Sequence, residues 1–184
     1  MTIIITTERL ILRTWQVEDE EAYFQINQDP KVIEFLSGPL TRKQVQDFIQ
    51  YVRRHDEQHG YTTWAAELKE TGALMGFIGL NTVDWQAHFT PVVEIGWRLG
   101  SEYWGKGYAT EGAKAALEYG FKHCNLPEIV AFTVPANIRS IRVMEKIGLK
   151  RDIHGDFEHP KLPKNHPLSK HVLYKLTKED YFRG

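Results

Sequence analysis

The sequence predicts a single domain, residues 1–184, that combines helices with mostly antiparallel strands. Three observations lead to this α+β fold class. Short runs alternate apolar and polar residues at a spacing of two, which is typical of half-buried strands. Longer runs repeat apolar residues every three or four positions, which is typical of amphipathic helices. Two strand-like runs, residues 62–69 and 73–83, are separated by a turn at Gly72 and predict an antiparallel hairpin.

The composition is that of an ordinary globular protein, with 42% hydrophobic and 26% charged residues. A formal net charge of -1 gives no overall attraction to nucleic acid or membranes, so neither is expected as a partner. No apolar run approaches the roughly 20 residues that span a bilayer, and the apolar start of the chain predicts a strand rather than a signal peptide. The single cysteine, Cys124, suits a reducing compartment, so we expect a cytoplasmic protein.

The first third of the chain predicts one strand and three helical segments. Residues 10–15 alternate in the manner of a strand. An acidic run then favours the first turn of a helix, and residues 29–39 predict a short helical piece. Thr41 and Gln44 form a capping-box pair that begins the third helix, which ends at Gly60.

The strand predicted at residues 92–99 has two different faces. Its odd-numbered residues are apolar and predict the core side, because successive side chains of a strand point to opposite faces. The residues that share the other face are Glu94, Gly96 and Arg98.

The last third predicts two helices and three strands. From Ala109, mostly small residues recur at helical spacing, so this helix can lie close against a sheet. A second helix begins with Asn137 as its N-cap and ends at Gly148. The strands are residues 128–134, 149–153 and 170–176.

The stretch "LGSEYWGKGYATEG", residues 99–112, places a glycine-rich turn between a strand and a helix. Unpaired N–H groups and the helix dipole converge at such a helix start, which predicts an anion site. A P-loop is one alternative, but Gly107 stands where its magnesium-binding Ser or Thr should be. A dinucleotide fingerprint is another, but Thr110 replaces its third glycine. A purely structural turn leaves Trp104 and Lys106 unexplained.

Two motifs, "EYWGKGYATEG" and "NIRSIRVMEKIGL", resemble in order and spacing those of the GNAT superfamily of acetyl-CoA-dependent N-acetyltransferases. The resemblance is greatest to the branch of ribosomal-protein N-terminal acetyltransferases, and it extends from "TERLILRTW" to "HVLYKL". It implies the GNAT fold, a mixed and mostly antiparallel sheet of about six to seven strands with helices on both faces. It also implies acetyl-CoA as the cosubstrate and no metal.

The resemblance further implies how coenzyme A is held. The family's pyrophosphate pattern, (Q/R)-x-x-G-x-(G/A), falls on Trp104, Gly107 and Ala109, with Trp104 in place of the usual Gln or Arg. The preceding strand splays from its neighbour and pairs with the pantetheine arm, which Gly96 lets approach closely. Asn137 is an N-cap and also a hydrogen-bond partner of the pantetheine. The cofactor-binding residues expected are the main chain of Trp97, Arg98 and Leu99, the backbone of Gly105, Lys106, Gly107, Tyr108, Ala109 and Thr110, and Asn137, with the Lys106 side chain either adding charge or simply solvated.

The reaction needs a base, because a free alkylamine is mostly protonated near neutral pH. Glu94 is the candidate base, acting directly or through water, unless it is paired with a lysine or arginine. Glu67, on the adjacent predicted strand, is the second candidate. The family often protonates the leaving thiolate with a Tyr, but Met144 occupies that position and cannot donate. Ser140 is therefore the candidate proton donor, or else a capping or surface hydroxyl.

These expectations describe a transferase that moves an acetyl group from acetyl-CoA to a primary amine by direct attack in a ternary complex. A covalent route through Cys124 is disfavoured, because Cys124 lies about 21 Å along its helix from Thr110. A GNAT-fold module that binds acyl-CoA without catalysis is the alternative, since the usual Tyr is missing. The sequence does not distinguish among protein N-termini, small amines, amino acids and aminoglycosides as the acceptor. It also leaves open whether the chain forms a homodimer.

The segment "EHPKLPKNHPLSKHVLYK" gathers three histidines and several lysines between the last two strands. No histidine pair has the spacing of a metal site, and aromatic residues that would stack on nucleic acid are sparse. We interpret the segment as a solvated loop, or else as a loop that gates the acceptor site and favours an acidic acceptor.

Overall fold

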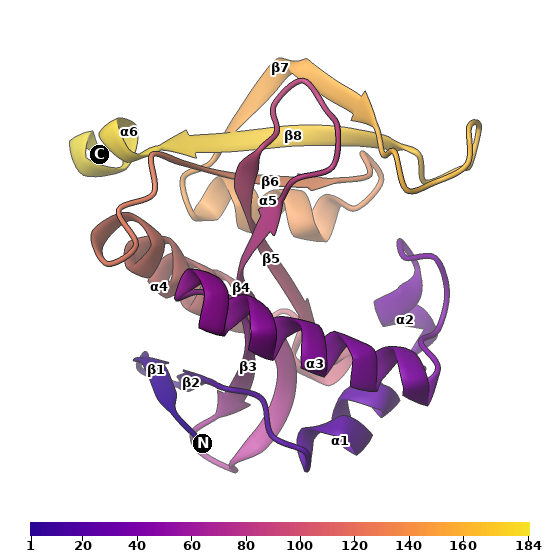
Figure 1. Cartoon of the computed structure of the whole chain (residues 1–184), viewed down its shortest axis with the longest axis vertical. Helices are drawn as coiled ribbons and strands as arrows, with labels where there is room; N and C mark the ends of the chain where they lie inside the picture. Colours follow the sequence, from indigo (N-terminus) through magenta and orange to yellow (C-terminus); the bar gives the residue numbers. More distant parts are fainter.

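The sheet has eight strands in the spatial order β1-β2-β3-β4-β5-β6-β8-β7 in the computed structural model, which describes residues 1–184 (Figure 1). All neighbouring strands are antiparallel except β5 and β6, which are parallel, so the mixed and mostly antiparallel sheet is confirmed. The strands are β1 (Ile3–Thr6), β2 (Leu10–Arg13), β3 (Thr63–Leu68), β4 (Ala73–Val83), β5 (Val92–Leu99), β6 (Glu128–Thr133), β7 (Lys150–Glu158) and β8 (Lys170–Thr177).

Helices cover both faces of the sheet, as predicted, with α3 in front of the strands in Figure 1 and α5 behind them. α1 and α3 pack on one face around Tyr23 and Ile49. α4 and α5 pack on the other face, on a larger core that includes Leu117 and Met144. None of these helices is both long and apolar enough to cross a membrane. They are α1 (Asp19–Ile26), α2 (Pro30–Ile33), α3 (Arg42–His59), α4 (Tyr108–Lys122), α5 (Ile138–Lys146) and α6 (Lys178–Arg183), with a 3-10 turn at Ser101–Tyr103.

The strand-like start of the chain divides into two strands, β1 and β2, and α6 lies beyond the elements that the sequence predicts. β1 is a four-residue edge strand, joined to β2 by a turn in which the Thr7 N–H donates to the Leu10 carbonyl at 3.0 Å. α6 has six residues and begins at Thr177, whose hydroxyl accepts from the Asp180 N–H at 3.1 Å. Elements this short do not complete a hydrophobic period that the sequence could show. They form because their partners elsewhere in the fold stabilise them.

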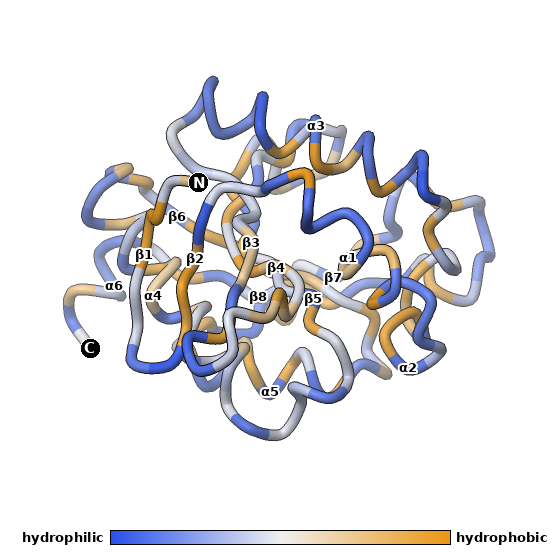
Figure 2. The backbone as a smooth tube through the Cα atoms, turned by 90° about the horizontal axis from the view of Figure 1, so that it is seen from below, coloured by the Kyte–Doolittle hydropathy of each residue, from blue (hydrophilic) through white to orange (hydrophobic).

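Local signals set the ends of the longer helices. At the start of α3, Thr41 and Gln44 make both hydrogen bonds of a capping box, and Gly60 ends the helix with a φ of 73°. α3 carries apolar residues along its inner side and polar residues outside (Figure 2). α4 lies close to the sheet because its inner residues are small: a Cβ on Gly112 would lie 2.4 Å from Ile78 Cδ1.

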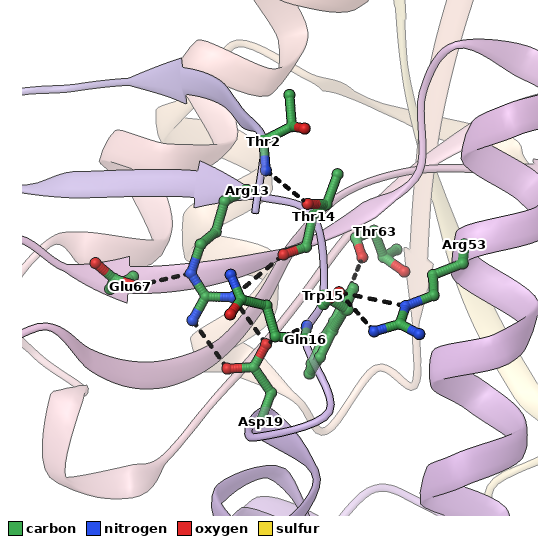
Figure 3. Close-up of polar contacts among 9 residues, drawn as sticks. All are labelled: Thr2, Arg13, Thr14, Trp15, Gln16, Asp19, Arg53, Thr63 and Glu67. Carbon is green, nitrogen blue, oxygen red and sulfur yellow. Dashed lines mark hydrogen bonds and ion pairs between the residues drawn. The ribbon is translucent and has the colours of Figure 1, made fainter.

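A buried ion-pair network fixes α1 to the N-terminal strands (Figure 3). Arg13 of β2 donates to both carboxylate oxygens of Asp19 at 2.8 Å, and to Glu67 of β3 at 2.7 Å. The side chains of Arg13 and Asp19 are each only 6% exposed. The facing carboxylates of Asp19 and Glu67 raise the pKa of Arg13 above its usual value, so its guanidinium stays charged despite burial.

β5 and β6 separate partway along their length, which opens the sheet near its centre. Their pairing involves Val93 and Glu94 of β5 and no later residue. β5 stays paired with β4 as far as Leu99, while β6 stays paired with β8 as far as Thr133. The edge of β5 beyond Glu94 therefore has backbone groups without a strand partner on the β6 side.

Candidate active site

A cavity of about 380 Å³ lies at this opening and takes its walls from β5, α4, α5 and the α2 segment. Ten of the twelve predicted site residues line it, although they come from three separate parts of the chain. Glu94 and Lys106 are the two that do not. The ten are Trp97, Arg98, Leu99, Gly105, Gly107, Tyr108, Ala109, Thr110, Asn137 and Ser140.

The turn before α4 presents backbone donors to the cavity. Gly105 and Gly107 have φ of 75° and 84°, which side-chain-bearing residues rarely adopt. Gly107 is the N-cap of α4 and has no side chain that could satisfy the first N–H groups. The cavity therefore meets a helix N-terminus whose donors and dipole favour an anion.

Arg9 holds this turn from outside, a role that the sequence did not reveal. Its Nη1 donates to the Lys106 carbonyl at 2.9 Å, and its Nε to Glu111 of α4 at 2.6 Å. Glu111 also accepts from the Thr7 hydroxyl at 2.7 Å and from the Arg9 N–H at 2.8 Å. The side chain of Lys106 is exposed outside the cavity wall, so its ammonium is the solvated lysine of the two alternatives.

Trp104 closes the loop in place of the Gln or Arg that is usual in the family. Its Nε1 donates to the Leu99 carbonyl at 2.8 Å, which folds the loop back onto the end of β5. The guanidinium of Arg139 lies 4.6 Å from the Trp104 ring, a cation–π distance. The side chain at this position thus braces the backbone turn.

Three cations of α5, namely Arg139, Arg142 and Lys146, line the cavity near the turn. They were not predicted as site residues, although their spacing of three and four residues places them on one helix face. Val32 and Phe35, in and just after α2, line the opposite wall together with Lys31. Nothing local in the sequence reveals that wall, because only the tertiary fold brings α2 to β5.

Glu94 lies on the face of β5 that carries Gly96 and Arg98, as predicted, and it makes no ion pair or hydrogen bond with the protein. Burial raises the pKa of its carboxyl to about 8. The ammonium of Lys161 lowers the same pKa, but by less than burial raises it. Its cross-strand neighbour is Asn81, whose side-chain carbonyl accepts from the Tyr51 hydroxyl at 2.7 Å. Glu67, by contrast, is bound to Arg13 in the network of Figure 3, so it is not a free base.

α5 carries the two predicted groups at its N-terminal end. The side chain of Asn137 accepts from the Ser140 N–H at 3.2 Å, so the N-cap prediction is confirmed. The hydroxyl of Ser140 makes no hydrogen bond with the protein and lines the cavity. Met144 is buried in the main core and has no proton to donate. Cys124 follows the far end of α4 as a half-buried residue packed on the core.

The histidine-rich segment is not fully solvated, which corrects the first interpretation of it. His159 and His171 pack against each other, with ring centroids 5.1 Å apart, and both contact the ring of Phe157. Burial lowers the pKa of His159 to about 4 and also lowers that of His171. Both rings are therefore neutral at pH 7 and belong to an aromatic cluster rather than to a basic surface.

A sheet that splays beside a helix N-terminus, with a cavity at the opening, offers unpaired backbone groups for an extended ligand and an anion site for its phosphate groups. The chain belongs to the GNAT acetyltransferase family, whose domain pattern matches residues 9–150. It is therefore an acetyl-CoA-dependent acyltransferase, the first of the two functions that the sequence left open.

Relatives over the whole chain agree with this family. The uncharacterized N-acetyltransferase YnaD of Bacillus subtilis is 32% identical over 178 residues, which are 96% of this chain and 98% of that protein. A solved GNAT-family acetyltransferase from Bacillus anthracis is 31% identical, with a TM-score of 0.76 over 95% of this chain and 98% of that one. RimL, a ribosomal L7/L12 alpha-N-protein acetyltransferase solved with coenzyme A, has the same fold, with a TM-score of 0.78 over 97% and 99% at 14% identity.

Proposed function

We propose that this acyltransferase carries an acetyl group from acetyl-CoA to a primary amine by direct attack in a ternary complex. The observation that carries the proposal is the position of the cavity. It starts at the turn before α4 and reaches the splayed part of β5, where Arg98 shares a face with the unpaired Glu94. A cofactor held by α4 and α5 and an acceptor beside the α2 segment can therefore meet at the middle of β5.

The residues present fit coenzyme A along its whole length. The backbone from Gly105 to Thr110 would hold the pyrophosphate, since donors at a helix N-terminus suit phosphate oxygens. Arg142 and Lys146, which have no ion-pair partner in the protein, would neutralise the remaining phosphate charge, whereas Arg139 is paired with Glu34 at 2.6 Å. The unpaired edge at Trp97, Arg98 and Leu99, together with Asn137, would pair with the pantetheine amides.

The chain's own groups then handle the protons. The bound thioester supplies an activated acetyl carbon. Glu94 takes a proton from the acceptor ammonium, directly or through water, and so frees the nitrogen lone pair. That lone pair forms the new N–C bond, the C–S bond breaks, and its electron pair leaves on sulfur. Ser140 lies at the cavity wall with a free hydroxyl, donates its proton to that thiolate and takes up, directly or through water, the second proton that the new amide nitrogen loses.

Steady-state kinetics with both substrates varied test this order of events. We expect thiol release that depends on an amine and double-reciprocal lines that intersect, because both substrates bind before chemistry. Parallel lines, together with loss of activity in Cys124→Ser, would instead indicate a covalent acetyl-enzyme. Thiol release that does not respond to any amine would contradict the proposal.

A further inference from the structure

The side chain of Arg98 is a cation without an anion. It is half-buried on β5, and its Nη1 donates to the Asn27 side-chain carbonyl at 2.6 Å and to the Tyr23 hydroxyl at 3.4 Å. No carboxylate lies within ion-pair distance, whereas the buried Arg13 has two. Charges removed from water are ordinarily paired, so this guanidinium has unused capacity for an anion.

The free donors of Arg98 open to the cavity. A guanidinium carries five N–H donors, and Nε and Nη2 of Arg98 have no hydrogen-bond partner in the protein. Both nitrogen atoms are therefore accessible to solvent, because neither is among the buried atoms that lack a partner. Arg98 is also one of the residues that line the cavity. A ligand in the cavity can therefore reach these donors.

Glu94 and Arg98 stand at the two ends of an open strip on the same face of β5. Only Gly96 shares this face between them, and the nearest atom to a Cβ placed there is Phe77 Cε2, at 3.8 Å. Four residues of strand separate the two Cα atoms by about 13 Å. The strip thus has a base at one end, an unpaired cation at the other and, between them, a glycine that lies beside the Phe77 ring.

The wall beside Arg98 is apolar apart from one further cation. Val32, Phe35 and Leu36 line the cavity there, and Lys31 adds a positive charge at the same wall. The nearby carboxylate of Asp29 is already used, since it accepts from the Ser101 hydroxyl and the Lys31 N–H. An anion with an apolar stem matches this wall better than a second amine does.

We infer that the acceptor is an ω-amino acid or diamino acid, in which an unbranched apolar chain separates the reacting amine from a carboxylate that Arg98 binds. This inference rests on the proposed function, because it takes Glu94 as the base. The α-amine of an ordinary amino acid lies two bonds from its carboxylate carbon and does not span the strip. A chain of four or five carbon atoms places its amine beyond Gly96 while the carboxylate stays on Arg98.

Three amines of equal chain length test the inference: 5-aminopentanoate, pentylamine and pentane-1,5-diamine. For the native chain we expect kcat/KM for 5-aminopentanoate to exceed both others by about tenfold or more, mostly through KM, as one charge-assisted bidentate contact allows. Arg98→Met should reduce the ratio of 5-aminopentanoate to pentylamine to about one. The matched control is Arg54→Met, an exposed arginine of α3, which should keep the ratio.

The outcomes separate the inference from the proposed function. Equal kcat/KM for the three amines, or a preference for the diamine, overturns the inference and leaves acetyl transfer intact. A rise in the KM for acetyl-CoA in Arg98→Met, with equal losses for all three amines, also overturns it, since Arg98 would then serve the cofactor. Absence of thiol release with every amine refutes the proposed function itself. If Arg98→Met melts early, Arg98→Lys decides: retention of part of the preference supports the inference, and an equal loss for all amines overturns it.

Discussion

The two sides of the site differ in which groups form them: backbone groups on one side and side chains on the other. The side that we propose for acetyl-CoA consists of backbone: the start of α4, the positive φ of Gly105 and Gly107, and the unpaired edge of β5. The side that we propose for the acceptor consists of side chains, chiefly Glu94 and Arg98, which depend on partners such as Asn27 from α1.

This difference explains what each side tolerates. A site made of backbone needs small residues and a fixed turn, so Trp104 can stand where Gln or Arg is usual and still brace the loop. A site made of side chains depends on the charge of each one. Single substitutions should therefore change acceptor chemistry strongly, while the cofactor side should respond only to residues that block or loosen the turn.

The largest effect should come from Glu94→Gln, which we expect to lower kcat about a thousandfold, because the amide cannot accept the proton. The pH dependence carries the same information. Burial raises the pKa of Glu94 to about 8, so only a small ionised fraction is present at pH 6. In the native chain kcat/KM should rise with pH up to about 8, as measured by thiol release between pH 6 and 9.

The stability of the same variant provides the control. The pKa of the Glu94 carboxyl is 4.5 in the unfolded chain and about 8 in the folded one, so between these values the native state binds the proton that the unfolded state has lost. Its contribution to stability is thus full below pH 4.5 and is lost as the pH rises through 8. Glu94→Gln should therefore remove this part of the pH dependence of stability, which melting curves recorded at several pH values measure. A native-like pH–rate profile in the variant would eliminate Glu94 as the base.

The second effect concerns the scaffold of the acceptor side. Asp19→Asn should lower the free energy of unfolding by about 3 kcal/mol, because the buried Arg13 of Figure 3 would keep only Glu67 as an anionic partner. α1 also carries Asn27 to Arg98, so the KM for the acceptor should rise more than that for acetyl-CoA. Asp47→Asn, which breaks an exposed pair with Lys43, is the control and should hardly change the melting temperature.

Much of the fold could be predicted because its signals are local. The capping box of Thr41 and Gln44 and the alternation along β5 lie within a few residues, and the structure has both. α6, and the division of the strand-like start into β1 and β2, could not be predicted in this way. Each of these elements is too short to show a period, and the neighbouring strand or helix start stabilises it.

The residues of the candidate site also fall into two groups, those with a local sequence signal and those without one. The turn at Gly107 and the cap at Asn137 are sequence motifs, and both residues line the cavity. The cations of α5 have a signal in their helical spacing, but a charged helix face does not by itself indicate a binding site. The unpaired state of Arg98, the wall that begins at Lys31 and the burial of His159 depend on contacts between distant segments, and no local pattern encodes them.

A third, intermediate effect tests the cofactor side. Ala109→Glu places a carboxylate at the start of α4, where we propose that phosphate binds, and should weaken coenzyme A binding about tenfold. Ala115→Glu is a matched control, since Ala115 is also half-buried on α4 but lies outside this cavity. Titration calorimetry with coenzyme A measures both variants. Equal affinities would mean that the pyrophosphate does not lie at this turn.

The smallest effect should come from Arg9→Ala, which removes the brace of the turn without touching the cavity wall. The ion pair of Arg9 with Glu111 is partly exposed, with side chains 41% and 17% accessible, so its contribution is modest. We expect the KM for acetyl-CoA to rise about twofold while the preference among acceptors stays the same, because the brace positions backbone donors and not Glu94 or Arg98. A change in acceptor preference in this variant would show that the two sides are coupled, and the distinction between a backbone site and a side-chain site would then fail.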